Sequence, residues 1–175
     1  MLELRATSLA DTHAIAAALA AVSRPGDLIV LSGEMGAGKT AFAQGFGRAL
    51  GVIEPITSPT FTLVHTYEIA AGHGHGAKSL HHADLYRLDR TTEVADLALE
   101  ELAEYQGIVL VEWGDVVDAL LGDHLVVHLE PDVFDDAGDD TSRADSTRLI
   151  EISATGPSWA PRWSRLVEGC EGFRC

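Results

Sequence analysis

The chain has 175 residues, of which 46% are hydrophobic and 22% are charged, a composition typical of a globular protein with one folded core. Its 27 acidic residues outnumber 12 basic ones, so the formal net charge is -15 at pH 7. An acidic surface repels the phosphates of nucleic acids. We therefore expect no direct, stable binding of RNA or DNA, and where RNA is involved we expect a partner to hold it.

Features of exported and membrane proteins are not expected either. No apolar run approaches the length of a membrane span, and residues 1–6 alternate and carry charge, unlike a signal peptide. The two cysteines, Cys170 and Cys175, fall in the last six residues, where we expect them to lie outside the core and to form no disulfide framework or zinc site. These features predict a cytoplasmic protein that makes no membrane contact.

The first elements along the chain alternate between strand and helix. Residues 2–6 alternate as a half-buried strand does, and Ser8 with Asp11 three residues on forms a capping box for a helix over residues 9–22. A turn leads to residues 28–31, a run that is apolar on both faces. Such runs are typical of central parallel strands covered by helices, so they indicate an α/β fold.

A phosphate-binding loop follows that apolar run. Residues 33–40 fit the pattern G-x-x-x-x-G-K-[ST], in which glycines let backbone N–H groups and a helix N-terminus point at an anion. Lys39 is placed to reach the β- and γ-phosphates of a nucleotide, and the Thr40 hydroxyl to ligate Mg²⁺. A helix over residues 39–50 follows. The residues expected to contact the nucleotide are Gly33, Glu34, Met35, Gly36, Ala37, Gly38, Lys39, Thr40 and Ala41.

A polar segment and a histidine-rich loop come next. Ser58 and Thr60 lie in a hydroxyl-rich stretch before a strand over residues 62–68, and they are either switch residues that sense the γ-phosphate or members of a simple turn. Residues 70–77 read as a flexible hairpin loop rich in glycine and histidine. No cysteine or helical histidine pair accompanies it, so we do not expect zinc there.

Two further strands each end in an acidic residue. The strand over residues 79–85 ends near Asp84, which is either a metal or water ligand or a cap of the following turn. After a helical region over residues 91–104, the apolar strand 107–113 ends in Glu112. This is the form of a Walker B element, whose carboxylate holds Mg²⁺ or activates the attacking water. A buried glutamate without a partner is costly, and bound Mg²⁺ would compensate it.

The remaining elements predict the edge of a sheet and a tail. After a short helix over residues 115–121, segments 124–130 and 147–154 alternate as antiparallel edge strands, joined by a solvated connection over residues 131–146. The predicted fold is therefore an α/β three-layer sandwich of the P-loop NTPase type, with a mostly parallel central sheet and antiparallel edge strands. We expect residues 1–155 to form this P-loop domain and residues 156–175 to form a tail that docks as a short helix or frays.

These features resemble the TsaE (YjeE) family of small bacterial ATPases over about residues 3–154. The phosphate loop is generic, whereas the three other blocks together are specific to the family. Two departures affect loop details: Glu34 replaces a usual aspartate and Gly114 replaces a frequent proline. The matching blocks are Gly33 to Phe42, Ser58 to Val64, His82 to Leu88 and Val111 to Trp113.

The resemblance implies ATP hydrolysis with Mg²⁺, weak alone and stimulated by partners. It implies that Lys39 contacts the phosphates, that Thr40, Asp84 and Glu112 surround the metal and its water, and that Thr60 is the switch residue. Family members act with TsaB and TsaD in threonylcarbamoyladenosine modification of tRNA, and they contact tRNA only indirectly through these partners.

Two other functions stay open. A small-molecule P-loop kinase has the same loop, although such kinases clamp two phosphorylated substrates with several arginines and no arginine cluster is present here. A nucleotide-gated assembly module would bind ATP or ADP without hydrolysing it and change its affinity for partners. A GTPase is disfavoured, because no Asn-Lys-x-Asp segment is present.

Overall fold

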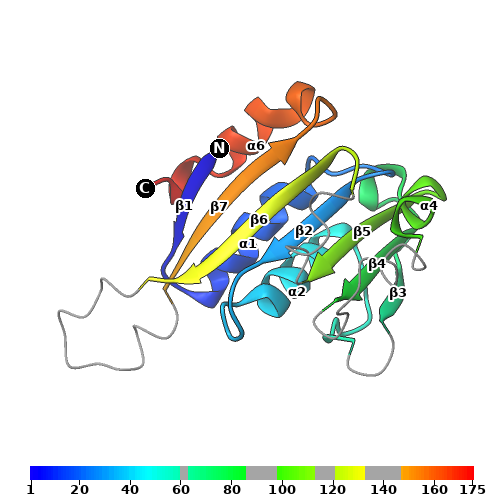
Figure 1. Ribbon diagram of the computed structural model, residues 1–175, viewed down its shortest axis with the longest axis horizontal. Helices are drawn as coiled ribbons and strands as arrows, with labels where there is room; N and C mark the ends of the chain where they lie inside the picture. The colour runs from blue at the N-terminus through cyan, green and yellow to red at the C-terminus, as the bar shows by residue number, and fades with distance from the viewer. Residues whose placement is uncertain (60–62, 86–97, 113–120, 133–146) are drawn as a thin grey trace.

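The computed structural model describes residues 1–59, 63–85, 98–112, 121–132 and 147–175, which form an α/β fold around one sheet (Figure 1). The strands of the described part lie in the order β1-β7-β6-β2-β5-β4-β3. Their bounds are β1 Leu2–Ala6, β2 Leu28–Ser32, β3 Val64–Glu68, β4 Ser79–Asp84, β5 Gly107–Glu112, β6 His124–Pro131 and β7 Arg148–Thr155.

The centre of the sheet is parallel and its edges are antiparallel, as the sequence predicts. Strand β2 pairs in parallel with β5 on one side and β6 on the other, and β4 pairs in parallel with β5. Strands β1, β7 and β3 join through antiparallel pairs. All residues of β2 and β5 are buried, because central parallel strands are covered on both faces.

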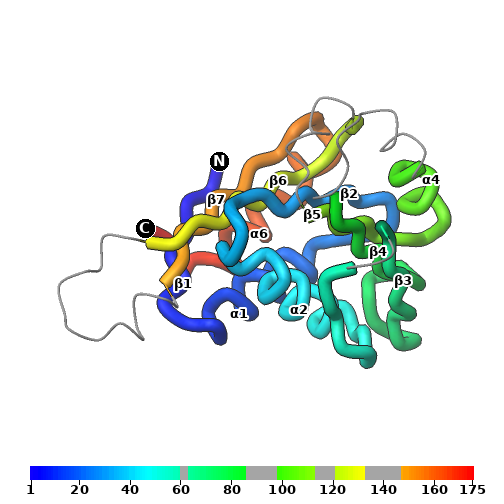
Figure 2. The backbone as a smooth tube through the Cα atoms, turned by 60° about the horizontal axis from the view of Figure 1, so that its bottom comes forward, coloured from blue at the N-terminus to red at the C-terminus, as the bar shows by residue number. Residues whose placement is uncertain are grey.

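Helices cover both faces of the sheet and complete the three predicted layers. Helices α1 and α2 pack against each other on one face, with α6 against α1, and Figure 2 shows α1 and α2 side by side below the sheet. On the other face, α4 packs against β5 through Leu99 and Ala103. The bounds are α1 Leu9–Ala20, α2 Lys39–Leu50, α4 Leu99–Glu104 and α6 Trp163–Gly169.

The start of α1 has the predicted capping arrangement. The Ser8 hydroxyl accepts a hydrogen bond from the Asp11 N–H at 3.1 Å, and the Asp11 carboxylate accepts from the N–H and hydroxyl of Thr7. These bonds satisfy backbone donors that have no partner inside the helix. The helix ends at Ala20, two residues before the predicted end, and Val22 lies in the core as part of the following turn.

The C-terminal segment packs into the core. The side chains of Trp159, Leu166 and Cys170 are buried in the same hydrophobic cluster as α1 and the sheet. The expectation that Cys170 lies outside the core was therefore wrong, because α6 turns this end of the chain onto α1. Burial raises the pKa of the Cys170 thiol to about 11.

A buried ion pair links this segment to the start of β2. The Arg162 guanidinium donates two bonds to the Asp27 carboxylate, at 2.6 and 2.8 Å, and it lies 3.9 Å from the centre of the Trp159 ring. Both charged side chains are less than a tenth exposed. The arrangement joins the C-terminal segment to the strand that leads into the phosphate loop.

Several predicted features lie outside the described residues or only partly within them. The described residues do not include Thr60, nearly all of the helix predicted over residues 115–121, or most of the connection over residues 131–146. The helix predicted over residues 91–104 is described only from residue 98, and α4 begins at Leu99. The strand predicted over residues 62–68 is described as β3 from Val64. None of the described helices has the length and apolarity needed to cross a membrane.

Candidate functional site

The phosphate loop joins β2 to α2 and depends on glycine at two positions. Gly33 has a φ of 128°, and a Cβ atom there would lie 2.1 Å from the Leu129 carbonyl oxygen of β6. Gly38, the residue before α2, has a φ of 106°, which other residues rarely adopt. The loop can therefore turn tightly and lie close to β6 only with glycine at these positions.

Lys39 lies at the first position of α2, and its side chain is only 5% exposed. Its Nζ atom donates to the carbonyl oxygens of Gly33 and Glu34, both at 2.8 Å. These bonds hold the ammonium against the loop, beside the backbone N–H groups at the start of the helix. The loop therefore gathers positive charge and N–H donors, the groups that bind a phosphate chain.

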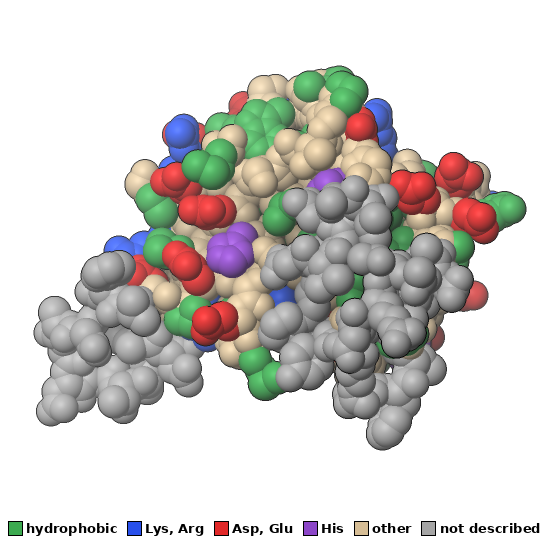
Figure 3. Space-filling view, viewed as in Figure 1, with side chains coloured by type: hydrophobic (Ala, Val, Ile, Leu, Met, Phe, Trp, Pro, Cys, Tyr) green, Lys and Arg blue, Asp and Glu red, His purple; other side chains and the backbone are tan. Residues whose placement is uncertain are grey.

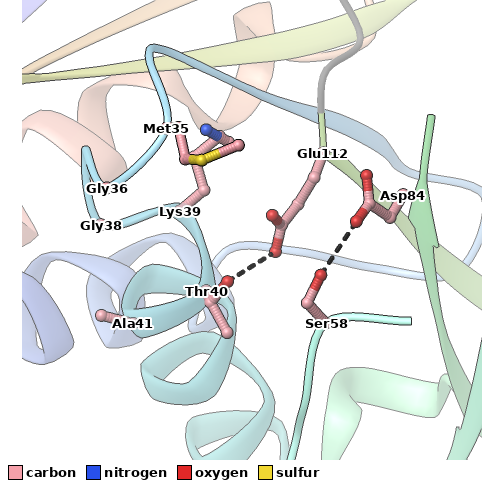
Figure 4. Close-up of a pocket in the computed structure, with 9 residues that line it drawn as sticks. All are labelled: Met35, Gly36, Gly38, Lys39, Thr40, Ala41, Ser58, Asp84 and Glu112. Atoms are coloured by element: carbon pink, nitrogen blue, oxygen red, sulfur yellow. Dashed lines mark hydrogen bonds between the residues drawn. The ribbon is translucent and has the colours of Figure 1, made fainter. Parts of the chain in front are cut away.

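The acidic residues predicted from the strand ends lie across from the loop. Asp84 of β4 and Glu112 of β5 are register partners, because the two parallel strands end at the same level. Glu112 Oε1 accepts a bond from the Thr40 hydroxyl at 3.3 Å, and Asp84 Oδ2 accepts one from the Ser58 hydroxyl at 2.9 Å (Figure 4). The carboxyl ends of these parallel strands thus bring both acids to the start of α2.

These residues line one cavity of about 320 Å³. Three predicted members of the site do not line this cavity: Ala37 is fully buried, and Gly33 and Glu34 contact Lys39 through their carbonyl oxygens. A fourth, Thr60, lies outside the described residues. Ser58, the other switch candidate, is in the cavity. The lining consists of Met35, Gly36, Gly38, Lys39, Thr40, Ala41, Ser58, Asp84 and Glu112.

The donors in the cavity fit Mg²⁺. Thr40 offers a hydroxyl and Asp84 and Glu112 offer carboxylates, which are the hard oxygen ligands that Mg²⁺ prefers. Mg²⁺ commonly takes one or two protein carboxylates, while phosphate oxygens and water complete its octahedron. Within the described ranges, no three His, Cys, Asp or Glu side chains are grouped so that they could hold a metal. The site therefore suits a cation that is shared with a bound phosphate chain.

The structure places two further residues beside the cavity that the sequence analysis did not assign to the site. His82 of β4 is fully buried, and its Nε2 lies 2.9 Å from Glu112 Oε1. Its spacing from Asp84 is the signal that would have found it, since residues two apart in a strand share a face. Arg148 of β7 donates from Nε to the Ala37 carbonyl of the loop at 3.0 Å. No local pattern connects Arg148 to a loop more than 100 residues away.

The neighbouring histidine has a different setting. His81 points to the opposite face of β4, where its ring nitrogens lie 2.9 Å from the Thr66 hydroxyl and 3.1 Å from the Ser79 hydroxyl. Burial lowers the pKa of His81, because the charged form loses its contact with water. Only His82 of this pair faces the cavity acids.

Comparison with protein families shows to which family the chain belongs. The model of the family described as threonylcarbamoyl adenosine biosynthesis protein TsaE matches residues 6–138, well over half of the chain. The chain belongs to the TsaE family. This TsaE family member contains the phosphate loop, Asp84 and Glu112 within the matched range, which confirms the resemblance seen in the sequence.

Individual TsaE relatives agree with the family match. The protein named tRNA threonylcarbamoyladenosine biosynthesis protein TsaE from Bacillus subtilis is 39% identical over 120 residues, which cover 69% of this chain and 71% of the relative. The protein of the same name from Streptomyces coelicolor is 37% identical over 144 residues, which cover 81% and 89%. The crystal structure of YdiB from Bacillus subtilis aligns with a TM-score of 0.67 at 32% identity, and it covers 98% of this chain and 94% of that one.

Proposed function

We propose that this TsaE family member is a Mg²⁺-dependent ATPase that acts in the threonylcarbamoyladenosine modification of tRNA. The observation that supports this most directly is the cavity in which Lys39 and Thr40 of the phosphate loop face Asp84 and Glu112 from two neighbouring strand ends. Family membership supports the pathway, since the matching family and both relatives carry threonylcarbamoyladenosine biosynthesis in their names.

In this proposal the loop binds the phosphates of ATP or ADP. Backbone N–H groups at the start of α2 face the phosphate chain, and Lys39 neutralises part of its charge. The Lys39 ammonium is held by two carbonyl groups at 2.8 Å, and we expect it to exchange one of them for a phosphate oxygen when nucleotide binds. The bond from Arg148 to the Ala37 carbonyl ties the loop to β7.

The acidic side of the cavity carries out hydrolysis. Thr40, Asp84 and Glu112 are the residues that would hold Mg²⁺, directly or through water, and when bound the ion neutralises charge that develops on the phosphates. Glu112 is 3% exposed and orients the attacking water, whose proton it accepts as a general base. Thr60 remains our switch candidate for sensing the γ-phosphate, alongside Ser58, which already bonds to Asp84.

We propose that the protein is cytoplasmic, that its partners are TsaB and TsaD homologues, and that tRNA contacts the complex through them.

The charge of one sheet face supports this indirect contact with tRNA. Figure 3 shows acidic side chains over β1, β7 and β6 on the sheet face opposite α1 and α2. Exposed Glu3, Glu130 and Glu151 belong to this face, because their neighbours in each strand point into the core. Such a surface repels an RNA backbone, so a role as an accessory ATPase agrees with the charge.

A small-molecule kinase is the second candidate, because a phosphate loop and Mg²⁺ ligands serve both reactions. Of the described residues that line the cavity, none is an arginine, whereas kinases of this kind use arginines to hold two phosphorylated substrates. A nucleotide-gated module is the third candidate. It would use the same binding residues without the Glu112 step.

The test is ATP turnover by the purified protein alone, with TsaB and TsaD homologues, and with a panel of phosphate acceptors. We expect slow phosphate release that the partners stimulate, and loss of turnover in Glu112→Ala with nucleotide binding retained. A phosphorylated acceptor would support the kinase. Binding without turnover in any mixture would support the nucleotide-gated module, and normal turnover by Glu112→Ala would make Glu112 structural.

A further inference from the structure

A buried hydrogen bond connects the cavity to a residue that does not line it. His82 is fully buried, and its Nε2 lies 2.9 Å from Glu112 Oε1. Glu112 is itself only 3% exposed. A carboxylate removed from water in this way is costly unless donors satisfy its oxygens, so the His82 contact has a direct effect on Glu112.

The direction of this bond follows from the chemistry of its two partners. An ionised carboxylate only accepts hydrogen bonds, so Nε2 of His82 carries the hydrogen. The other ring nitrogen, Nδ1, is buried and has no hydrogen-bond partner among the residues that the structure describes. Within that part of the chain, Glu112 is therefore the polar partner that orients the His82 ring.

The bond also determines which oxygen of Glu112 is engaged. Oε1 accepts from both His82 Nε2 and the Thr40 hydroxyl, at 2.9 and 3.3 Å. Figure 4 shows the second oxygen of Glu112 on the side of the phosphate loop. Two donors on one oxygen thus leave the other directed at the space where phosphate and water would lie.

We propose that His82 is a positioning residue that sets the orientation of the Glu112 carboxylate for hydrolysis. This proposal rests on the proposed ATPase function, because it concerns how the Glu112 carboxylate is oriented toward the attacking water. His82 does not line the cavity itself and acts through Glu112, which does. Its removal would leave Glu112 buried with one weak donor, Thr40, and free to adopt other rotamers.

The main test compares His82→Leu, which keeps an apolar side chain without a donor, with His82→Gln, whose side-chain amide can donate at a position close to Nε2. We expect His82→Leu to lower kcat about 10- to 100-fold, the usual effect of removing a residue that orients a site ligand, while the Kd for ATP changes less than about threefold. His82→Gln should recover most of kcat. His81→Leu is the matched control, because its ring lies on the opposite face, and it should keep the wild-type kcat.

Equal kcat for His82→Leu and wild type would overturn the proposal. So would a parallel loss of kcat in His82→Leu and His82→Gln, or a loss of ATP binding that accounts for the whole effect, since a purely structural role predicts these. Thermal melting of each variant separates misfolding from mispositioning.

A second measurement does not require turnover. In ¹⁵N NMR spectra of the nucleotide-free protein, His82 should appear with hydrogen on Nε2, and Glu112→Ala should shift that signal while the His81 signal stays in place. An unshifted His82 signal would overturn the proposal whether or not the protein is an ATPase. If wild type with its partners hydrolyses no ATP, the proposed function fails, and this spectrum still decides the His82–Glu112 contact.

Discussion

Replacing Arg162 tests how strongly the C-terminal segment stabilises the fold. Arg162→Met would leave the Asp27 carboxylate, with its side chain only 6% exposed, without its bidentate partner. Breaking one side of a buried ion pair costs about 3–5 kcal/mol, because the remaining charge stays buried. For a chain of this size each 1 kcal/mol lowers Tm by about 2–4 °C, so we expect a decrease of roughly 6–20 °C in thermal unfolding followed by circular dichroism.

The control is Arg165→Met in α6, three residues after Arg162. The Arg165 side chain is exposed, and its loss should change Tm by no more than about 2 °C. The double variant Arg162→Met with Asp27→Leu should recover part of the lost Tm, because neither charge then remains buried. If Arg162→Met melts within 2 °C of Arg165→Met, the ion pair does not hold the segment and the reasoning fails.

Four further outcomes are expected. Lys39→Ala should abolish ATP binding in titration calorimetry, because it removes the loop's ammonium, and unchanged affinity would reject the loop assignment. Arg148→Met should weaken ATP binding by about tenfold with little change in kcat, because it removes a charge-assisted hydrogen bond of roughly 1.5 kcal/mol that holds the loop at Ala37. Equal affinity of this variant and the wild type for ATP would show that the bond does not contribute to nucleotide binding. The Thr7 hydroxyl lowers the pKa of Asp11, so this bond stabilises the fold above pH 3.8 and is lost as pH falls through the folded pKa. Because this bond is exposed, Asp11→Asn should lower Tm by only about 1–2 °C at pH 7 and by much less at pH 2.5, and an equal decrease at both would contradict this sign. The isolated protein should not retard tRNA in a gel shift at low salt, and a salt-sensitive complex would contradict the charge argument.

Short local patterns in the sequence predict many of the residues that the structure brings together around the cavity. The loop over residues 33–40 needs glycines and a lysine at fixed spacing, and the apolar strands before Asp84 and Glu112 are visible as continuous runs. One topological rule then brings them together, because parallel strands end at the same edge of a sheet. The central parallel strands and antiparallel edges were predictable for the same reason.

Contacts that depend on edge-strand order, on helix docking or on the exact pairing of strands could not be predicted. Arg148 and Ala37 are 111 residues apart, and their bond depends on β7 lying beyond β6 at the sheet edge. Cys170 directly follows the short helix α6, and its burial depends on where α6 docks on α1. In the sequence His82 stands out only as the first residue of the block His82 to Leu88, because its partner Glu112 becomes evident only when β4 and β5 are paired.

The two cysteines differ in a way that gives this protein a natural attachment point for a probe. Cys170 is buried with its pKa raised to about 11, whereas Cys175 is exposed. Alkylating reagents react with accessible thiolates, so at neutral pH a maleimide dye should label Cys175 selectively. The Cys175 N–H donates to the Glu3 carbonyl of β1 at 3.4 Å, so the dye would be placed at the outer edge of the sheet, three strands away from β2 and the phosphate loop. The natural chain can thus carry one fluorophore for following complex assembly while every residue of the cavity stays unchanged.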